Sequence, residues 1–499
     1  MTLRLDTLVL IIWLCGGLWQ PAPLYAADPR LPARQFRPVP LRLDVRQDAR
    51  VFVPFSALAA AGWPMVTVDA ARIHVRRQGR EVAAEQQADG LRFLATASDS
   101  PHTVEAAYWL AVEDDAGLRT ALPAVWYRPL VWEVDSVYQP AARTVRGDRW
   151  FAAELRAGIP WKTTLALPHE LPAGSELHIT LTALEPLLEH HIDVWVNGVA
   201  LLPATWSGAA PVRLPFALPI RLPAGDVHVE LLSQAADDTV LLDTISLPEA
   251  MCAQPELRAS HLTPRAALPP HDDVDTVIVT HESLQEAVEP LAEAHRAAGQ
   301  RVAVLDVQAA YDAYSFGERD PQAIRALLRA MQPPPTRIVL AGAASVDTRA
   351  APGEADSTLV PTMLVDADPK NGEIACDTCF ARFDGDDVLA DPLPDAQVGR
   401  LPFHSAAEAQ VLITKTVRSL GRRPGGAWRM QALLVGDNDR EWDGTPDAAG
   451  PFTPTLTQLA HTMTPALVAQ RFVYAPAGSQ QEGDYQDVGA LRTALLTSW

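Results

Sequence analysis

The sequence predicts a multidomain protein with two N-terminal β-domains followed by an α/β region that contains a parallel sheet. Short runs of strand composition, separated by polar or glycine-containing stretches, occupy residues 38–250. Beyond residue 273, continuous apolar runs alternate with amphipathic helical segments, which is typical of a parallel sheet covered on both faces. The length of 499 residues supports several domains, because it exceeds what one hydrophobic core normally organises.

The first β-domain is expected at residues 27–130. The 43 prolines of the chain suit many short strands joined by turns, as in a domain of this kind. Residues 56–61 predict one helical turn, which Gly62 ends. Its strands are expected at residues 51–53, 71–75, 91–94 and 107–112.

The second β-domain is expected at residues 131–250 as a jelly-roll-like sandwich. Asn197 and Gly198 lie between two strand-like runs and predict a hairpin, since both residues tolerate a positive φ. His190 and His191 precede a strand, but no carboxylate cluster accompanies them at metal-ligand spacing. We therefore interpret both histidines as edge or packing residues. The strands are expected at residues 177–181, 192–196 and 227–232.

A proline-rich stretch at residues 251–272 is interpreted as a linker, and an α/β subdomain is expected at residues 273–424. Asp320 and Pro321 predict the start of one of its helices, as N-cap and first helical residue. Its strands are expected at residues 274–279, 301–307 and 337–342, and an amphipathic helix at 283–298.

A second subdomain of the same kind is expected to start at residue 425 and to run to residue 499. Its pattern is strand, helix, strand, helix, with no strand for the last helix to lead into. Because such a sheet has an open edge and an uncovered apolar face, we expect this subdomain to be incomplete within the sequence. The four elements are expected at residues 430–436, 453–463, 470–474 and 487–498.

The N-terminus predicts export. Arg4 precedes an apolar run at residues 8–19, and small residues follow at Ala26 and Ala27, so residues 1–26 are expected to be a cleaved signal peptide. An uncleaved anchor is the weaker alternative, and no later segment is apolar enough to span a membrane. The expected location is the periplasm, the cell surface or the extracellular space. A net charge of -20 argues against nucleic acid as a partner.

Export favours oxidation of the cysteines that remain after signal removal. Cys376 and Cys379 are therefore expected to form a local disulfide. Two alternatives for these cysteines need features that the sequence does not show. A redox motif requires a helix start after a strand, and a zinc site requires a second pair of ligands. Cys252 is left over and is expected to be an inert thiol, because it has no local histidine partner.

An aspartate-rich stretch is the one candidate metal site in the sequence. Asp384, Asp386 and Asp387 offer the hard oxygens that calcium prefers, with low specificity, because the full alternating ligand loop is missing. A solvated turn is the simpler interpretation. No other cofactor is expected.

Several segments taken together resemble the gingipain-like cysteine peptidases. They are residues 311–317 (YDAYSFG) running into 320–325 (DPQAIR), then 360–362 (VPT), 383–387 (FDGDD) and 394–402 (PDAQVGRLP), with Lys415 in the helix that follows. The order and spacing of the set are more specific than any single piece.

This resemblance implies two side-by-side caspase-like subdomains. Residues 273–424 would be the first, noncatalytic half, and residues 425–499 the start of the second. The family's second half supplies a histidine in a Gly-His type motif and then a nucleophilic cysteine, and we expect both beyond Trp499. No catalytic residue is therefore assigned in this sequence. The implied activity is hydrolysis of a protein or peptide substrate by a Cys/His dyad, in which the imidazole activates the thiol.

Three alternatives remain beside an active peptidase. Cys376 or Cys379 with His404 would be a substitute dyad, which lacks the Gly-His motif. A noncatalytic extracytoplasmic binding or assembly protein would use the β-modules and the first caspase-like half to hold a partner. A carbohydrate-binding jelly roll is the weakest, because tryptophans in sandwiches are more often core. The tryptophans that suggest it are Trp150, Trp161, Trp195 and Trp206.

Overall fold

The computed structural model describes most of the chain that follows the predicted signal peptide. The predicted signal peptide itself, residues 1–26, lies outside the described residues. No helix of the described residues is long and apolar enough to cross a membrane. The structure describes residues 37–142, 148–186, 188–234, 239–269, 272–347, 349, 357–368, 372–421, 426–440, 444–447, 450–463, 467–475 and 483–498.

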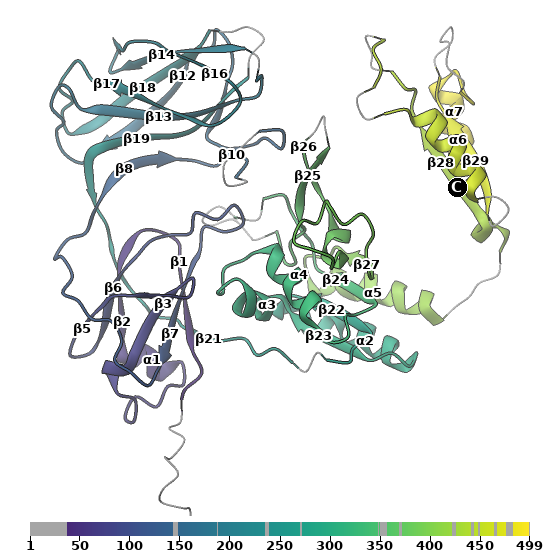
Figure 1. The fold of residues 1–499 in the computed structure, drawn as a ribbon, viewed down its shortest axis with the longest axis horizontal. Coiled ribbons are helices and arrows are strands. Elements are labelled where there is room, and N and C mark those ends of the chain that lie inside the picture. The colour runs from purple at the N-terminus through teal and green to yellow at the C-terminus, as the bar shows by residue number, and fades with distance from the viewer. Residues whose placement is uncertain are drawn as a thin grey trace, which may run out of the picture. The chain divides into compact units, whose positions relative to one another are not determined.

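The first β-domain consists of two sheets packed around one core (Figure 1). One sheet has the strand order β21-β1-β7-β3-β4 and the other β20-β2-β6-β5. The four expected strands coincide with β2, β3, β6 and β7, and α1 occupies the expected helical turn. The bounds are β1 Leu41–Val45, β2 Ala49–Pro54, α1 Phe55–Ala60, β3 Ile73–Arg77, β4 Arg80–Val82, β5 Ala84–Gln86, β6 Gly90–Ala95 and β7 Ala106–Val112.

The linker expected at residues 251–272 is wrong in part. Residues Glu256–Arg258 form β20, which pairs in parallel with β2, and Thr263–Pro264 form β21, which pairs antiparallel with β1. Both short strands therefore cover edges of the first β-domain. Their partners lie about two hundred residues earlier in the chain, so no local pattern could reveal the pairing.

The second β-domain packs two antiparallel sheets on each other. The orders are β11-β19-β13-β17, with β8 beside β19, and β12-β18-β14-β15, with β16 beside β14. Because β8 begins at Tyr127, this domain starts earlier than the expected residue 131. The bounds are β8 Tyr127–Glu133, β9 Val137–Tyr138, β10 Trp150–Phe151, β11 Ala153–Leu155, β12 Trp161–Leu167, β13 Glu176–Ala183, β14 Glu189–Val196, β15 Val199–Ala200, β16 Ala204–Ser207, β17 Val212–Ala217, β18 Gly225–Ser233 and β19 Val240–Ala253.

The hairpin turn and the two histidines of this sandwich lie as the sequence predicts. Asn197 and Gly198 have φ values of 49° and 77° and connect β14 to β15. His190 is fully buried with its ring centroid 5.0 Å from that of Trp206, and His191 Nε2 lies 3.0 Å from Asp193 Oδ1. Both histidines therefore serve the packing and the sheet surface.

The first α/β subdomain has a four-stranded parallel sheet in the order β23-β22-β24-β27. Val277 and Val279 of β22 join the core that contains α3, α4 and η3, whereas Ile278 joins the core that contains α2 and α5. Both faces are covered, which explains the uninterrupted apolar run. The bounds are β22 Thr276–Thr280, α2 Gln285–Ala297, β23 Val302–Asp306, α3 Val307–Tyr314, α4 Pro321–Ala330, β24 Arg337–Ala341, η3 Asp377–Ala381, β27 Gln397–Leu401 and α5 Ala406–Gly421.

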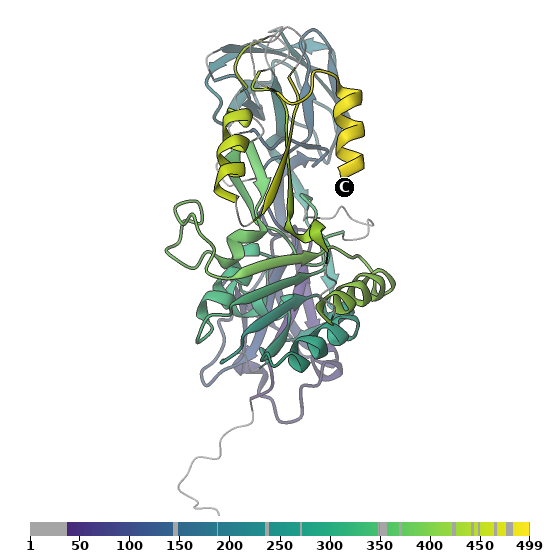
Figure 2. The same ribbon diagram turned by 90° about the vertical axis from the view of Figure 1, so that its right-hand side faces the viewer.

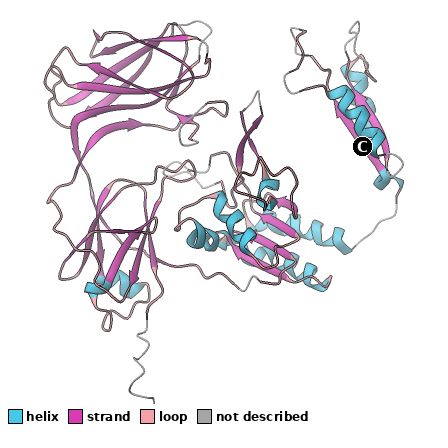
Figure 3. Ribbon diagram, viewed as in Figure 1, coloured by secondary structure: helices cyan, strands magenta, loops and turns pink. Residues whose placement is uncertain are grey.

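Two smaller groups of elements complete the described fold (Figure 3). An antiparallel hairpin, β25 Leu364–Asp368 and β26 Gly372–Ala375, follows the loop after β24. Near the C-terminus, β28 pairs in parallel with β29, and Figure 2 shows α6 and α7 on either side of the two strands. The bounds are β28 Gln431–Gly436, α6 Phe452–Met463, β29 Val468–Val473 and α7 Val488–Ser498.

Candidate functional site

The described cysteines are not arranged as nucleophiles. Cys376 and Cys379 are joined in a disulfide at the start of η3. Cys252 is a free thiol on β19, and burial raises its pKa, which disfavours the reactive thiolate. A catalytic thiol requires the opposite effect, a pKa lowered by a nearby imidazole or cation.

The substitute dyad considered from the sequence is not assembled either. His404 lies at the start of α5 with its side chain 58% exposed, and its Nδ1 is 3.6 Å from Glu408 Oε2. The sulfur atoms that would need this imidazole are bonded to each other. His404 therefore belongs to the N-terminal turn of a helix, where a carboxylate at Glu408 also accepts the His404 backbone N–H at 2.9 Å.

The carboxyl edge of the parallel sheet is where an α/β protein usually places its ligands. Here Arg400 of β27 fills that edge. Its guanidinium donates to Asp377 Oδ1 and Oδ2, both at 2.7 Å, and to the carbonyl oxygens of Gly342, Val360 and Pro361 at 2.8, 2.7 and 3.1 Å. One side chain thus ties the end of β24 to the following loop and to η3.

The charge of Arg400 is matched by its carboxylate partner. Burial raises the pKa of Asp377, but hydrogen bonds and the charge of Arg400 lower it more, so the net pKa is lowered. Thr362 Oγ1 also donates to Asp377 at 2.8 Å. The family segments at residues 360–362 and 394–402 therefore build a structural network, a role that their sequence did not reveal.

The segment at residues 311–317 contacts the first β-domain. Asp312 has a side chain that is 1% exposed and lies 2.9 Å from Arg42 of β1. Its carboxylate also accepts from Gln308 Nε2 at 2.8 Å and from the Ala266 backbone N–H at 2.7 Å. A buried carboxylate with these three donors is fully compensated.

Phe316 and Gly317 continue the same contact. Trp109 Nε1 of β7 donates to the Phe316 carbonyl oxygen at 2.6 Å. Gly317 has a φ of +92°, and a Cβ atom there would lie 3.0 Å from side-chain atoms of both Arg42 and Trp109. Glycine is required at this position because the backbone is left-handed and the space is occupied. This segment is a docking element for the β-domain.

A second contact joins the α/β subdomain to the sandwich. Arg349, in the loop after β24, makes ion pairs with Asp135 and Asp148. Nearby, Arg149 lies 3.1 Å from Glu373 of β26, which accepts a hydrogen bond from Tyr138 at 2.7 Å. These pairs hold Arg349 and the β25–β26 hairpin against the segment around β9 and β10.

Asp243 of β19 lines a cavity of about 620 Å³, together with Arg349, Asp135 and Asp148. Burial raises its pKa to about 7, and the neighbouring carboxylates of Glu133, Asp148 and Asp135 contribute to the rise. The Arg349 guanidinium opposes the rise only in part. The cavity therefore holds more negative than positive side chains.

The aspartates predicted to bind calcium are exposed and are not gathered into a ligand set. Asp386 lies 3.0 Å from Arg329, and Asp387 accepts the Leu389 backbone N–H at 2.9 Å. Asp384 uses its own backbone N–H to reach Asp391 at 3.1 Å. Among the described residues, the one group of three ligand side chains within 4.8 Å lies elsewhere. Calcium binding here stays a prediction.

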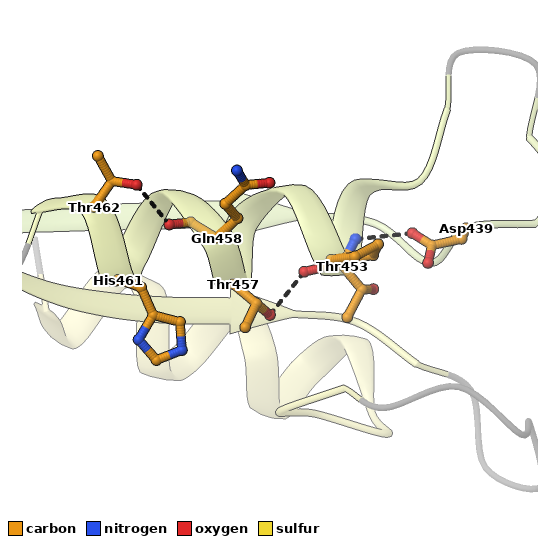
Figure 4. A pocket seen from close by; sticks show the side chains of 7 residues that line it. Asp439, Thr453, Thr457, Gln458, His461 and Thr462 are labelled. Carbon is orange, nitrogen blue, oxygen red and sulfur yellow. Dashed lines mark hydrogen bonds between the residues drawn. The ribbon is translucent and has the colours of Figure 1, made fainter.

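A hollow of about 780 Å³ lies along α6 (Figure 4). Figure 4 shows that its hydroxyl groups bond within the helix: Thr457 donates to the Thr453 carbonyl at 2.9 Å and Thr462 to the Gln458 carbonyl at 3.0 Å. Asp439 accepts the Thr453 backbone N–H at 2.9 Å and so caps the helix. Its described lining has no thiol beside His461.

A comparison with known protein families matches the α/β region. Residues 269–497 match the model of peptidase family C25. The α/β region of the chain therefore resembles this gingipain-like family. The C25 region so defined begins just before β22 and ends within α7. A comparison of the whole chain with curated protein sequences finds no match.

One solved structure supports the fold, and two others share shorter parts of it with low scores. Dimeric latent PorU from Porphyromonas gingivalis has a TM-score of 0.55 and 15% identity, over 79% of this chain and 50% of that chain. The complex of Porphyromonas gingivalis RgpB pro- and mature domains gives 0.27 and 16%, over 40% and 42%. The Arg-specific cysteine proteinase gingipain R gives 0.28 and 14%, over 42% and 44%. The chain thus spans about half the length of PorU, and this likeness confirms a β-rich multidomain fold with a parallel sheet.

Proposed function

We propose that the protein is an exported cysteine endopeptidase of the gingipain type, with a protein or peptide as substrate. In this proposal residues 273–424 of the C25 region are the noncatalytic caspase-like half, and residues 425–499 belong to the half that carries the chemistry. The Cys/His dyad does not involve any cysteine of residues 1–499. The match of residues 269–497 to the model of peptidase family C25 supports the reaction class.

The match to family C25 is the observation that carries this proposal, and the state of the cysteines supports a dyad that uses none of them. Two sulfur atoms are oxidised in a disulfide, and Cys252 has a raised thiol pKa. Cys15, the remaining cysteine of the sequence, lies in the predicted signal peptide. Arg400 and Asp377 occupy the carboxyl edge of the first sheet with a structural network. The first half is therefore suited to supporting a site and not to performing thiol chemistry.

The test compares this chain with a chain extended through the DNA that follows the Trp499 codon. We expect the 499-residue chain to show no peptide cleavage that an alkylating agent abolishes. The DNA immediately downstream of the Trp499 codon should encode, in some reading frame, a strand followed by Gly-His and then a cysteine. A chain extended through that segment should gain alkylation-sensitive cleavage, and replacing the new cysteine with alanine should remove it. Turnover by the 499-residue chain that Cys376→Ala or Cys252→Ala abolishes would contradict the proposal.

A second candidate is a noncatalytic extracytoplasmic binding or assembly protein. The ion pairs of Arg42 with Asp312 and of Arg349 with Asp135 and Asp148 favour it, because they join the first caspase-like half to both β-domains. Such a platform could hold a partner without a dyad. Downstream DNA that encodes no cysteine in any frame would favour this candidate over the peptidase.

A further inference from the structure

One tryptophan of the sandwich is not explained by packing. Trp161 and Trp206 pack against the core of the sandwich. The ring centroid of Trp150 lies 5.2 Å from that of Tyr138. Among the described residues, Trp195 of β14 belongs neither to this core nor to a pair of neighbouring rings. The structure therefore separates Trp195 from the other three tryptophans that suggest sugar binding from the sequence.

The strand register places Trp195 on the outer face of its sheet. Its neighbours along β14, Val194 and Val196, are each 1% exposed and belong to the core, so the side chain between them points the other way. Across the neighbouring strands (Figure 1), Trp195 lies opposite Glu230 of β18, and Glu230 lies opposite Lys162 of β12. One row across three strands therefore holds an indole, a carboxylate and an ammonium group.

The next row of the same face adds a hydroxyl and an imidazole. Thr164 of β12 lies opposite His228 of β18, and Thr164 Oγ1 is 3.0 Å from His228 Nδ1. In the first row, Lys162 Nζ lies 3.0 Å from Glu230 Oε2. These four polar side chains and Trp195 line a hollow of about 310 Å³. A hollow of this volume can hold a small molecule.

The turn between β14 and β15 borders the hollow. Gly198 lines it, and a Cβ atom built on this glycine would meet nothing within 4 Å, so the space beside it is open. Asn197 Oδ1 accepts the backbone N–H of His228 at 2.8 Å and so ties the turn to β18. Side chains on paired strands beside a tied turn hold their positions more precisely than side chains on a loop.

The polar groups of the hollow keep capacity for further hydrogen bonds. The side chain of Lys162 is 67% exposed and that of Glu230 is 32% exposed. Because an ammonium group carries three N–H bonds and a carboxylate accepts at two oxygens, their contact leaves donors and acceptors on both. The indole N–H of Trp195 donates to no described residue. The opposite charges of Lys162 and Glu230 also balance, which favours a neutral ligand over an anion or a cation.

We propose that this hollow binds a neutral sugar unit of a glycan. The C–H groups on one face of a pyranose ring pack on an electron-rich aromatic face, here that of Trp195. The hydroxyl groups at the rim of the sugar both donate and accept hydrogen bonds, so they can pair with the Glu230 carboxylate and the Lys162 ammonium group at once. The site lies on the sandwich and does not depend on the peptidase chemistry proposed above.

The experiment measures how far the full chain is retarded in native gels that contain a dissolved polysaccharide. Dextran, mannan, galactan and β-glucan are the neutral probes, and polygalacturonate is the anionic probe. A calorimetric titration with ovalbumin, before and after enzymatic removal of its glycans, distinguishes a glycan on a protein from a free polysaccharide.

The test variants are Trp195→Ala and Glu230→Gln, the second of which keeps the shape of the side chain. The matched control is Trp428→Ala, which removes an indole that is 64% exposed and lies outside the sandwich. Thermal melts check that each variant folds. If Trp195→Ala does not fold, Glu230→Gln carries the test.

We expect at least one neutral polysaccharide, or the glycans of ovalbumin, to bind the chain, and polygalacturonate to retard it less. Trp195→Ala should weaken this binding by about tenfold or more, Glu230→Gln by about tenfold, and Trp428→Ala not at all. The proposal is overturned if no neutral probe binds or if polygalacturonate binds best. It is equally overturned if Trp195→Ala and Trp428→Ala weaken binding alike, because any exposed indole would then explain the contact.

Discussion

The two α/β regions of the chain have the same alternation of strand and helix but differ in what covers their strands. All five residues of β22 in the first region are buried. In β28 of the second region Leu434 alone is buried, and Val435 is 49% exposed. Among the described residues β28 and β29 pair with each other, whereas β22 lies between two strands. An apolar run therefore predicts a strand, and long-range neighbours decide how far it is buried.

The difference extends to the charged side chains. Arg400 in the first region is 13% exposed and serves four partners at the edge of the sheet. Arg471 in the second region is 27% exposed and pairs with Asp484 at 3.0 Å. Removing a guanidinium from a buried network leaves its carboxylate and carbonyls without donors, whereas water can replace it at the surface.

The largest expected effect comes from Arg400→Ala. It should lower the free energy of unfolding of the first region by about 2 kcal/mol, because three carbonyl oxygens would lose their donor and Asp377, whose side chain is 32% exposed, would keep Thr362 but lose its cation. Arg471→Ala, the matched change in the second region, should cost less than about 1 kcal/mol. Hydrogen exchange at the amides of β24 and β29 measures each region separately. Equal losses in the two variants would remove the contrast between the regions.

A smaller effect is expected from the same substitution in two strands. Val279→Ala in β22 removes a side chain that is 1% exposed and should cost about 2 kcal/mol through lost apolar burial and the cavity left behind. Val435→Ala in β28 should cost about 0.5 kcal/mol or less. The free energies from hydrogen exchange at each strand report both values. A loss at Val435 as large as that at Val279 would mean that β28 is covered.

A pH dependence is expected at the contact of the first region with the sandwich. Asp243 has a pKa of about 7 in the folded protein and about 3.9 unfolded, so the folded state binds more protons between these values. Stability should therefore fall as pH rises from about 4 to about 7. Asp243→Asn should flatten this slope in thermal melts, and Asp226→Asn, at an exposed site in the same sandwich, should leave it unchanged. A slope that Asp243→Asn does not alter would refute this role of the cavity.

Local patterns predicted most strands and helices. Continuous apolar residues located β22 and β24, Asp320 with Pro321 located the start of α4, and Asn197 with Gly198 located a hairpin. Each of these elements depends on residues that are close together in the sequence, so local patterns are enough to predict them. The strands β20 and β21 were missed because their stability comes from edges of a distant domain.

The candidate site was less accessible from sequence. The family segments were visible, but the five hydrogen bonds of Arg400 and the pairing of Asp312 with Arg42 join residues far apart in the chain.

The central claim is that none of the cysteines after the predicted signal peptide is a nucleophile. Alkylation rates at each cysteine of the native chain, followed by mass spectrometry at neutral pH, test it directly. We predict that Cys252 reacts more slowly than a small model thiol, and that Cys376 and Cys379 remain unlabelled until the chain is reduced. Rapid labelling of any of the three, at a rate above that of the model thiol, would contradict the account.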